Sequence, residues 1–152
     1  GLLCAKNEII VFLDGDINPY PEHMIEQMTE PILNDQCDFI KAAFARNSGR
    51  VTELVAKPLL SMFFPRLSHY LQPLSGMIAG KKKFFQNIEF FNDYGVDIGI
   101  LIDMHTQNAR IEEVHIGYIE NDSKPLHELG KMSKEVASAI IKKAFSQNNN
   151  AI

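Results

Sequence analysis

Apolar and polar positions along the chain follow patterns that predict alternating strands and helices. The run Ile9–Leu13 is continuously apolar and rich in β-branched residues, which is typical of a strand covered on both faces, as in a parallel α/β sheet. A second strand is predicted over residues 38–45. Residues 114–118 alternate between apolar and polar positions, which predicts a half-buried strand.

Between and after these strands, apolar residues recur at helical spacing, which predicts helices. Helices are predicted over residues 21–34, 53–64, 134–145, and from Asn92 or Asp93 through Asp103. Met24, Met28 and Ile32 form the buried stripe of the first, Thr52 is predicted to cap the second, and Pro58 interrupts it. Residues 72–80 contain two glycines and a proline and are predicted to form an irregular loop. We therefore expect one mixed α/β domain over residues 1–145, with a polar tail at 146–152.

Composition narrows the class of protein. The 152 residues are 45% hydrophobic and 22% charged, which is typical of a soluble globular protein. A net charge of −4 argues against a general nucleic-acid or anionic-membrane binder, and no apolar run approaches the roughly 20 residues of a membrane span. Cys4 and Cys37 have neither metal-ligand spacing nor the pattern of a disulfide framework, so we expect a cytoplasmic protein.

The sequence Asp14-Gly15-Asp16 follows the first predicted strand directly. In open α/β sheets, ligands bind beyond the carboxyl ends of strands. Gly15 allows a tight turn, so both carboxylates can approach one hard cation, Mg²⁺ or Mn²⁺, that also contacts substrate phosphates. The alternative interpretation is an ordinary Asp-Gly turn with a solvated second aspartate.

Two other motifs that begin with this acidic pair can be tested on the sequence. An EF-hand loop starting at Asp14 needs glycine at its sixth position and glutamate at its twelfth, where this chain has Pro19 and Ile25. That motif is excluded. A phosphatase of the haloacid-dehalogenase type also has Asp-x-Asp after a strand, but it expects threonine or valine where Asn18 stands, so it is kept as a weaker alternative.

Longer segments of the chain resemble a known family. The acidic pair after a buried strand is similar to the Asp-x-Asp motif of glycosyltransferases with the GT-A fold. More specifically, four blocks in the same order resemble glucosyl-3-phosphoglycerate synthase and its mannosyl counterpart. These blocks are residues 49–60 (GRVTELVAKPLL), 72–76 (QPLSG), 94–103 (YGVDIGILID) and 129–133 (LGKMS).

The resemblance implies a fold and an activity. It implies the carboxyl-terminal part of a three-layer GT-A domain, with a mixed, mostly parallel sheet flanked by helices and without the amino-terminal nucleotide-binding part. The family transfers a hexose, with retention, from a nucleotide sugar (UDP- or GDP-hexose) to 3-phosphoglycerate. By the resemblance we expect metal-assisted transfer to that acceptor or a related small phosphorylated one. We expect this fragment alone to be inactive, and homodimer formation stays open.

The resemblance also assigns residues to the donor side. Asp14 and Asp16 would face the ribose and diphosphate of the nucleotide sugar, with Asp16 as the main metal ligand. Asp97 stands where the family has a glutamate beside the transferred sugar, and its carboxylate could stabilise positive charge at the anomeric carbon. The residues implied to line the sugar pocket are Leu74, Ser75 and Gly76.

The acceptor site is implied by Gly49, Arg50 and Thr52. A backbone amide at a turn, a guanidinium fork and a hydroxyl at a helix start are suited to bind phosphate and carboxylate groups. Without the flanking motif, Arg50 would be interpreted as a solvated loop arginine.

Four positions depart from the family pattern. Asn121 replaces a metal-binding histidine, Lys124 and Ile119 replace phosphate-binding arginines, and Met77 replaces a glutamate. An asparagine carbonyl suits Mg²⁺ better than Mn²⁺. These departures motivate an alternative function, a non-catalytic remnant that binds a phosphorylated small molecule or a protein partner.

Overall fold

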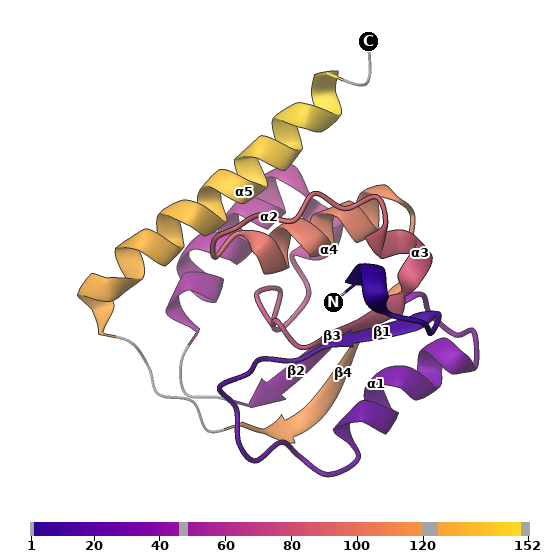
Figure 1. The fold of residues 1–152 in the computed structure, drawn as a ribbon. Helices are drawn as coiled ribbons and strands as arrows, with labels where there is room; N and C mark the ends of the chain where they lie inside the picture. The colour runs from indigo at the N-terminus through magenta and orange to yellow at the C-terminus, as the bar shows by residue number, and fades with distance from the viewer. Residues whose placement is uncertain (1, 46–48, 120–124, 150–152) are drawn as a thin grey trace. The chain divides into compact units, whose positions relative to one another are not determined.

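The chain forms two compact units in the computed structural model, which describes residues 2–45, 49–119 and 125–149 (Figure 1). The first unit comprises Gly1–Arg46, Ser75–Ile88 and Met104–Asn121, and the second comprises Asn47–Leu74, Glu89–Asp103 and Asp122–Ile152. Each unit collects segments that are distant in sequence. The predicted single domain over residues 1–145 stays a prediction.

A four-stranded mixed sheet forms the centre of the first unit (Figure 1). Its strands are β1 (Ile9–Phe12), β2 (Phe39–Ala45), β3 (Ile78–Lys81) and β4 (Ile111–Tyr118), in the order β1-β3-β2-β4. β3 pairs antiparallel with both β1 and β2, whereas β2 and β4 are parallel. The mixed α/β class is therefore confirmed: β1, β2 and β4 run in one direction, and only β3 of the four described strands runs against them.

Strand β3 is the strand that the sequence analysis did not predict. Most of it lies inside the predicted loop 72–80, where Gly76 and Gly80 obscure the local pattern of a strand. The prediction for β1 also needs correction. All four of its residues are only partly buried, because among the described strands β1 pairs with β3 alone and lies at the sheet edge.

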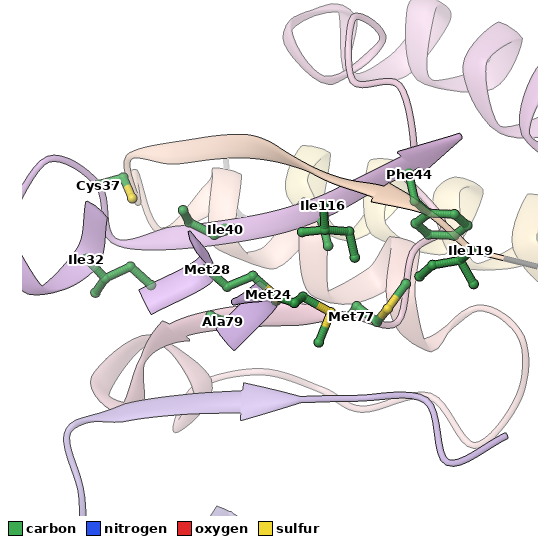
Figure 2. Packing of buried hydrophobic residues seen from close by; sticks show 11 residues of the cluster. Met24, Met28, Ile32, Cys37, Ile40, Phe44, Met77, Ala79, Ile116 and Ile119 are labelled. Atoms are coloured by element: carbon green, nitrogen blue, oxygen red, sulfur yellow. The ribbon is translucent and has the colours of Figure 1, made fainter. Parts of the chain in front are cut away.

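One face of the sheet packs against helix α1 (Met24–Leu33), as Figure 2 shows. The predicted stripe of Met24, Met28 and Ile32 is confirmed, with exposed fractions of 2%, 0% and 2%. The cluster around it, called here the α1 core, also contains Cys37, Ile40, Ala42, Phe44, Met77, Ala79, Ile116 and Ile119. Truncating a buried methionine of this kind to alanine costs about 2–5 kcal/mol.

The opposite face carries an aromatic cluster. The rings of Phe12 and Phe39 lie 5.3 and 6.1 Å from the ring of Phe85, which closes the short helix α3 (Lys82–Phe85). Gly80 makes this packing possible, because a Cβ on residue 80 would lie 2.9 Å from the Phe85 ring.

The second unit is helical. Its main elements are the π-helical turn Thr52–Ala56, α2 (Lys57–Phe63), α4 (Val96–Thr106, which continues into the first unit) and α5 (Leu129–Asn149). Short 3₁₀ turns occur at Pro65–Leu67 and Leu126–Glu128 in this unit and at Leu2–Cys4 in the first unit. Helix α5 extends beyond its predicted end at Phe145. No helix among the described residues is both long and apolar enough to cross a membrane.

The π-helical turn explains how the chain remains helical before Pro58. A proline has no N–H to donate, and its ring collides with the carbonyl of the residue four positions earlier. The Lys57 N–H donates instead to the Thr52 carbonyl, which widens the turn, and α2 then begins with Pro58 in its first turn.

Lys143 joins α5 to α4 in the second unit. The Lys143 ammonium lies 2.8 Å from the Asp103 carboxylate, and residue 143 is only 9% exposed. Burial raises the pKa of Asp103, and the hydrogen bond from Lys143 opposes that shift. Asp103 therefore has a structural role, because its carboxylate holds Lys143 of α5 against α4.

An ion-pair cluster fastens one end of the sheet in the first unit. Arg110, before β4, holds both carboxylate oxygens of Asp38 at 2.9 and 3.0 Å, and Lys81 at the end of β3 lies 2.7 Å from the same carboxylate. Asp35 completes the cluster at 2.6 Å from Arg110 and 2.7 Å from Lys81. The hydrogen bonds from Arg110, followed by those from Lys81, hold the pKa of Asp38 well below its usual range.

This cluster gives a prediction of pH-dependent stability. Asp38→Asn should lower the free energy of unfolding by about 1–3 kcal/mol at neutral pH, because hydrogen bonds to a charged carboxylate are lost. A lowered pKa in the folded state means that the contribution is present above the unfolded pKa of about 3.9 and is lost as the pH falls below it. Chemical denaturation should show the gap between the two proteins shrinking from neutral pH to about pH 3.

The matched control is Asp35→Asn. The Asp35 side chain is 75% exposed, against 10% for Asp38, so its removal should cost less. A gap for Asp38→Asn that is the same at both pH values would contradict the prediction.

Candidate functional site

The strand directions of the first unit bring several predicted site segments to one end of the sheet. β1, β2 and β4 all run toward this end, and β3 runs away from it. The turn at Asp14–Asp16 follows β1, residues 75–77 precede β3, and Ile119 follows β4. Asp14 and Asp16 therefore share one end of the sheet with Ser75 and Gly76, which the sequence analysis drew from a separate motif.

Asp14 and Gly76 are in direct contact at this edge. A Cβ built on Gly76 would collide with the Asp14 carboxylate, so any side chain at position 76 would displace one of the two. Asp14 is half-buried and Asp16 is exposed, and nothing lies within 4 Å of a Cβ built on Gly15. In the acidic turn, Asp14 therefore packs against the segment before β3, whereas Gly15 and Asp16 face solvent.

Tyr20 is a residue of this site that the sequence analysis missed. Its hydroxyl donates a hydrogen bond to the backbone carbonyl of Asp14. Burial, and then the negative charges of Asp14 and Asp16, raise the pKa of Tyr20, so its hydroxyl stays protonated and able to donate this hydrogen bond. The available signal was an aromatic residue between Pro19 and Pro21, just after the acidic turn.

Ser75 and Leu74 were expected to line the sugar pocket, but neither side chain is fully exposed. The Ser75 hydroxyl is buried and accepts a hydrogen bond from the Met77 backbone N–H at 3.3 Å, so it shapes the segment before β3. Leu74 is half-buried and belongs to the second unit. Contact between Ser75 and a sugar would therefore use its backbone.

The departures from the family pattern fall into two groups. Met77 and Ile119 are 0% and 3% exposed and are both members of the α1 core, near Phe44 (Figure 2). Neither contributes a charged group to the sheet edge. Asn121 and Lys124 lie outside the described residues.

Asp14 and Asp16 fit a divalent cation that is also bound by substrate. Among the described residues, no three histidine, cysteine, aspartate or glutamate side chains could hold a metal ion by themselves. Mg²⁺ is commonly bound by one or two carboxylates, several waters and substrate phosphates. The open side of the turn at Asp16 leaves room for such ligands.

In the second unit, the predicted acceptor motif begins a helical segment. Helical structure starts at Arg50, and the Glu53 N–H donates to the Gly49 carbonyl at 2.8 Å. Thr52 lies inside this segment and makes no side-chain cap, which corrects the prediction, because the helix begins before it. Its side chain is 2% exposed, and no described residue forms a hydrogen bond with its hydroxyl.

Asp97 lies in the first turn of α4, in the second unit. Asp93 accepts a hydrogen bond from the Gly95 N–H at 2.8 Å, and Glu135 on α5 accepts one from the Tyr94 N–H at 3.2 Å. These contacts hold the chain just before Asp97. A hollow of about 520 Å³ beside it is lined by Phe91, Asn92, Asp93, Tyr94, Val96, Asp97, Lys131 and Glu135.

Characterised proteins of one kind are similar to this chain. No protein-family model matches the chain. A glucosyl-3-phosphoglycerate synthase of Petrotoga mobilis is 35% identical over 156 aligned residues, which cover 93% of this chain and 48% of that enzyme. The Mycobacterium tuberculosis enzyme of the same name is 34% identical over 158 residues, covering 92% and 48%. The chain is homologous to glucosyl-3-phosphoglycerate synthases.

Solved structures agree with this result. The Mycobacterium tuberculosis glucosyl-3-phosphoglycerate synthase in complex with phosphoglyceric acid has a TM-score of 0.87 at 34% identity, over 94% of this chain and 52% of that chain. The same enzyme with Mn²⁺, UDP-glucose and phosphoglyceric acid has a TM-score of 0.85, and with Mg²⁺ and UDP 0.86. The GT-A-like fold is confirmed, and the chain spans about half the length of these glucosyl-3-phosphoglycerate synthases.

Replacing each of two glycines tests the contact between Asp14 and residue 76 in this homologue of glucosyl-3-phosphoglycerate synthases. Gly76→Ala should destabilise the chain by about 0.5–1.5 kcal/mol, because its methyl group forces the Asp14 carboxylate out of its preferred rotamer. Gly15→Ala is the matched control, because its methyl group would stand in open space, and it should change stability by less than about 0.5 kcal/mol. Equal effects of the two variants in chemical denaturation would contradict the assigned contact.

Proposed function

We propose that this chain is the carboxyl-terminal portion of a retaining hexosyltransferase. The enzyme would transfer a hexose from UDP- or GDP-hexose to 3-phosphoglycerate or a related small phosphorylated acceptor, with Mg²⁺ or Mn²⁺. The chain alone would bind substrate groups without completing the reaction, since it spans about half of its relatives. Residues 146–152 would lie outside the catalytic portion.

The observation that carries this proposal is the contact between Asp14 and Gly76 at the end of the sheet. It joins the Asp-x-Asp turn to the predicted sugar-pocket segment in a chain whose structural neighbours bind UDP-glucose, Mn²⁺ and phosphoglyceric acid. Two motifs assigned from separate blocks of sequence thus meet where a nucleotide sugar would bridge them.

On the donor side, the carboxylates would bind and orient the nucleotide sugar. Asp16, on the open side of the turn, is the proposed main metal ligand, and Asp14 faces the ribose and diphosphate. Asn121 is the proposed third metal ligand, and Lys124 would contact the diphosphate. A divalent cation bound there would neutralise the negative charge of the diphosphate leaving group.

The sugar and the acceptor would be held by the remaining residues. The backbone of Leu74, Ser75 and Gly76 would line the sugar pocket. The Asp97 carboxylate would accept hydrogen bonds from sugar hydroxyls and stabilise positive charge that develops at the anomeric carbon. The residues proposed to bind the phosphate and carboxylate of the acceptor are Gly49, Arg50 and Thr52.

Thr52 supports the acceptor assignment independently of sequence blocks. Burying a hydroxyl without a partner costs about 1–3 kcal/mol, so proteins rarely retain one without a use. The Thr52 hydroxyl is buried and has no partner among the described residues, which is expected of a group whose partner is a ligand.

A second candidate is a non-catalytic remnant that binds a phosphorylated small molecule or a protein partner. The observation that favours it is the burial of Met77 and Ile119 in the α1 core, where the resemblance expects a glutamate and an arginine. This candidate shares the acceptor site but not the donor site. The phosphatase alternative has no counterpart among the relatives reported above.

The two cysteines support a proposal about the cellular setting. Cys4 is an exposed free thiol and Cys37 a buried one, and burial raises the pKa of Cys37 to about 11, which makes it unreactive. We infer a reducing compartment, the cytoplasm.

Calorimetric titration of 3-phosphoglycerate into this chain tests the acceptor site. Arg50→Ala should weaken binding by at least about tenfold, because hydrogen bonds to charged groups contribute roughly 1.5–3 kcal/mol. Arg66→Ala is the control, since it removes the same charge from an exposed turn of the same unit outside the motif. Equal losses from both variants would indicate a general charge effect and contradict the assignment.

Thr52 gives a test in which stability and binding change in opposite directions. Thr52→Val should leave the free energy of unfolding unchanged or higher, because a buried hydroxyl without a partner is removed. The same change should weaken 3-phosphoglycerate binding about three- to tenfold, whereas Thr52→Ser should retain binding. Loss of stability in Thr52→Val with unchanged binding would assign the hydroxyl to the fold.

A further inference from the structure

Tyr20 is fixed at both ends of its side chain. Its ring packs against the α1 core, together with Ile17 from the same loop. Its hydroxyl donates to the carbonyl of Asp14, six positions earlier in the chain. The segment from Asp14 to Tyr20 is therefore a loop closed by one side chain that is itself anchored in the core.

The rest of the acidic turn has little to hold it. Gly15 and Asp16 are exposed, and no atom lies within 4 Å of a Cβ built on Gly15. Packing therefore cannot fix the direction in which the Asp16 side chain points. The contacts that do fix the turn act on Asp14, whose carboxylate lies against Gly76 and whose carbonyl accepts the Tyr20 hydrogen bond.

We propose that Tyr20 is a positioning residue for the nucleotide-sugar site, because its hydroxyl anchors the backbone of the Asp14-Gly15-Asp16 turn to the α1 core. This role rests on the proposed function, in which Asp16 is the main metal ligand. Ligands held in place before binding lose less conformational freedom when the metal and diphosphate arrive, which strengthens binding. Tyr20 touches neither substrate nor metal in this role.

The expected consequence is specific to one hydroxyl. Tyr20→Phe keeps the ring and its packing against the α1 core and removes only the hydrogen bond to Asp14. The fold should therefore persist, while the turn becomes more mobile and binds a cation less well. Tyr70→Phe is the control, since it removes the same group from the second unit.

Two measurements on this chain test the proposal. Hydrogen–deuterium exchange should be faster in Tyr20→Phe for a peptide covering residues 13–17 and unchanged for peptides from α1. Titration of Mn²⁺ in the presence of UDP, followed by the electron paramagnetic resonance of free Mn²⁺, should show affinity lowered about three- to tenfold. Tyr70→Phe should match the unaltered chain in both measurements.

Three other outcomes would each overturn the proposal, and each would show a different reason for the failure. Unchanged exchange at residues 13–17 would mean that the hydroxyl does not hold the turn. Faster exchange throughout α1 would mean that Tyr20 serves the fold in general. Faster exchange confined to the turn with unchanged Mn²⁺ affinity would mean that the order of the turn does not govern binding.

The proposed function can fail separately. Absence of Mn²⁺ binding by the unaltered chain with UDP would contradict the donor site itself, and the positioning role with it. Binding of 3-phosphoglycerate, which depends on Arg50 in the second unit, should be unaffected by Tyr20→Phe. A loss of that binding in Tyr20→Phe would contradict a role confined to the acidic turn.

Discussion

The Asp14 carboxylate lies where a side chain on residue 76 would have to stand, and the candidate site depends on this steric constraint. Because residue 76 is glycine, the acidic turn after β1 can rest against the segment that leads into β3. The antiparallel insertion of β3 between β1 and β2 creates that neighbourhood. A short, glycine-flanked strand thus brings the metal-binding motif and the sugar-pocket motif together.

One end of the sheet carries an ion-pair cluster, and the other carries the acidic turn. At one end, Arg110 and Lys81 saturate the carboxylate of Asp38 and tie together the start of β2, the end of β3 and the start of β4. At the other end, the acidic turn keeps an open side at Asp16. Ion pairs at the far end of the sheet leave the binding end to present the exposed Asp16 carboxylate.

Met77 and Ile119 are described positions at which this chain differs from the pattern of the family that it resembles. Both enter the α1 core, where an isolated charge would be costly to bury. Because Met77 and Ile119 belong to the same hydrophobic cluster, each gives the other an apolar environment. The charges proposed to meet the diphosphate are therefore those of Asp14, Asp16 and Lys124, together with the bound cation.

Local sequence patterns determined most elements of this protein, but not how they meet. Apolar spacing identified β1, β2 and β4, together with the buried stripe of α1, because neighbours within a few residues decide those features. The motif blocks identified the acidic turn and the acceptor segment in the same way. Only the tertiary structure revealed β3, the Asp14–Gly76 contact, the Tyr20 hydrogen bond and the burial of Thr52. Strand pairing and burial depend on residues far apart in the chain, and no local periodicity records which of them come into contact.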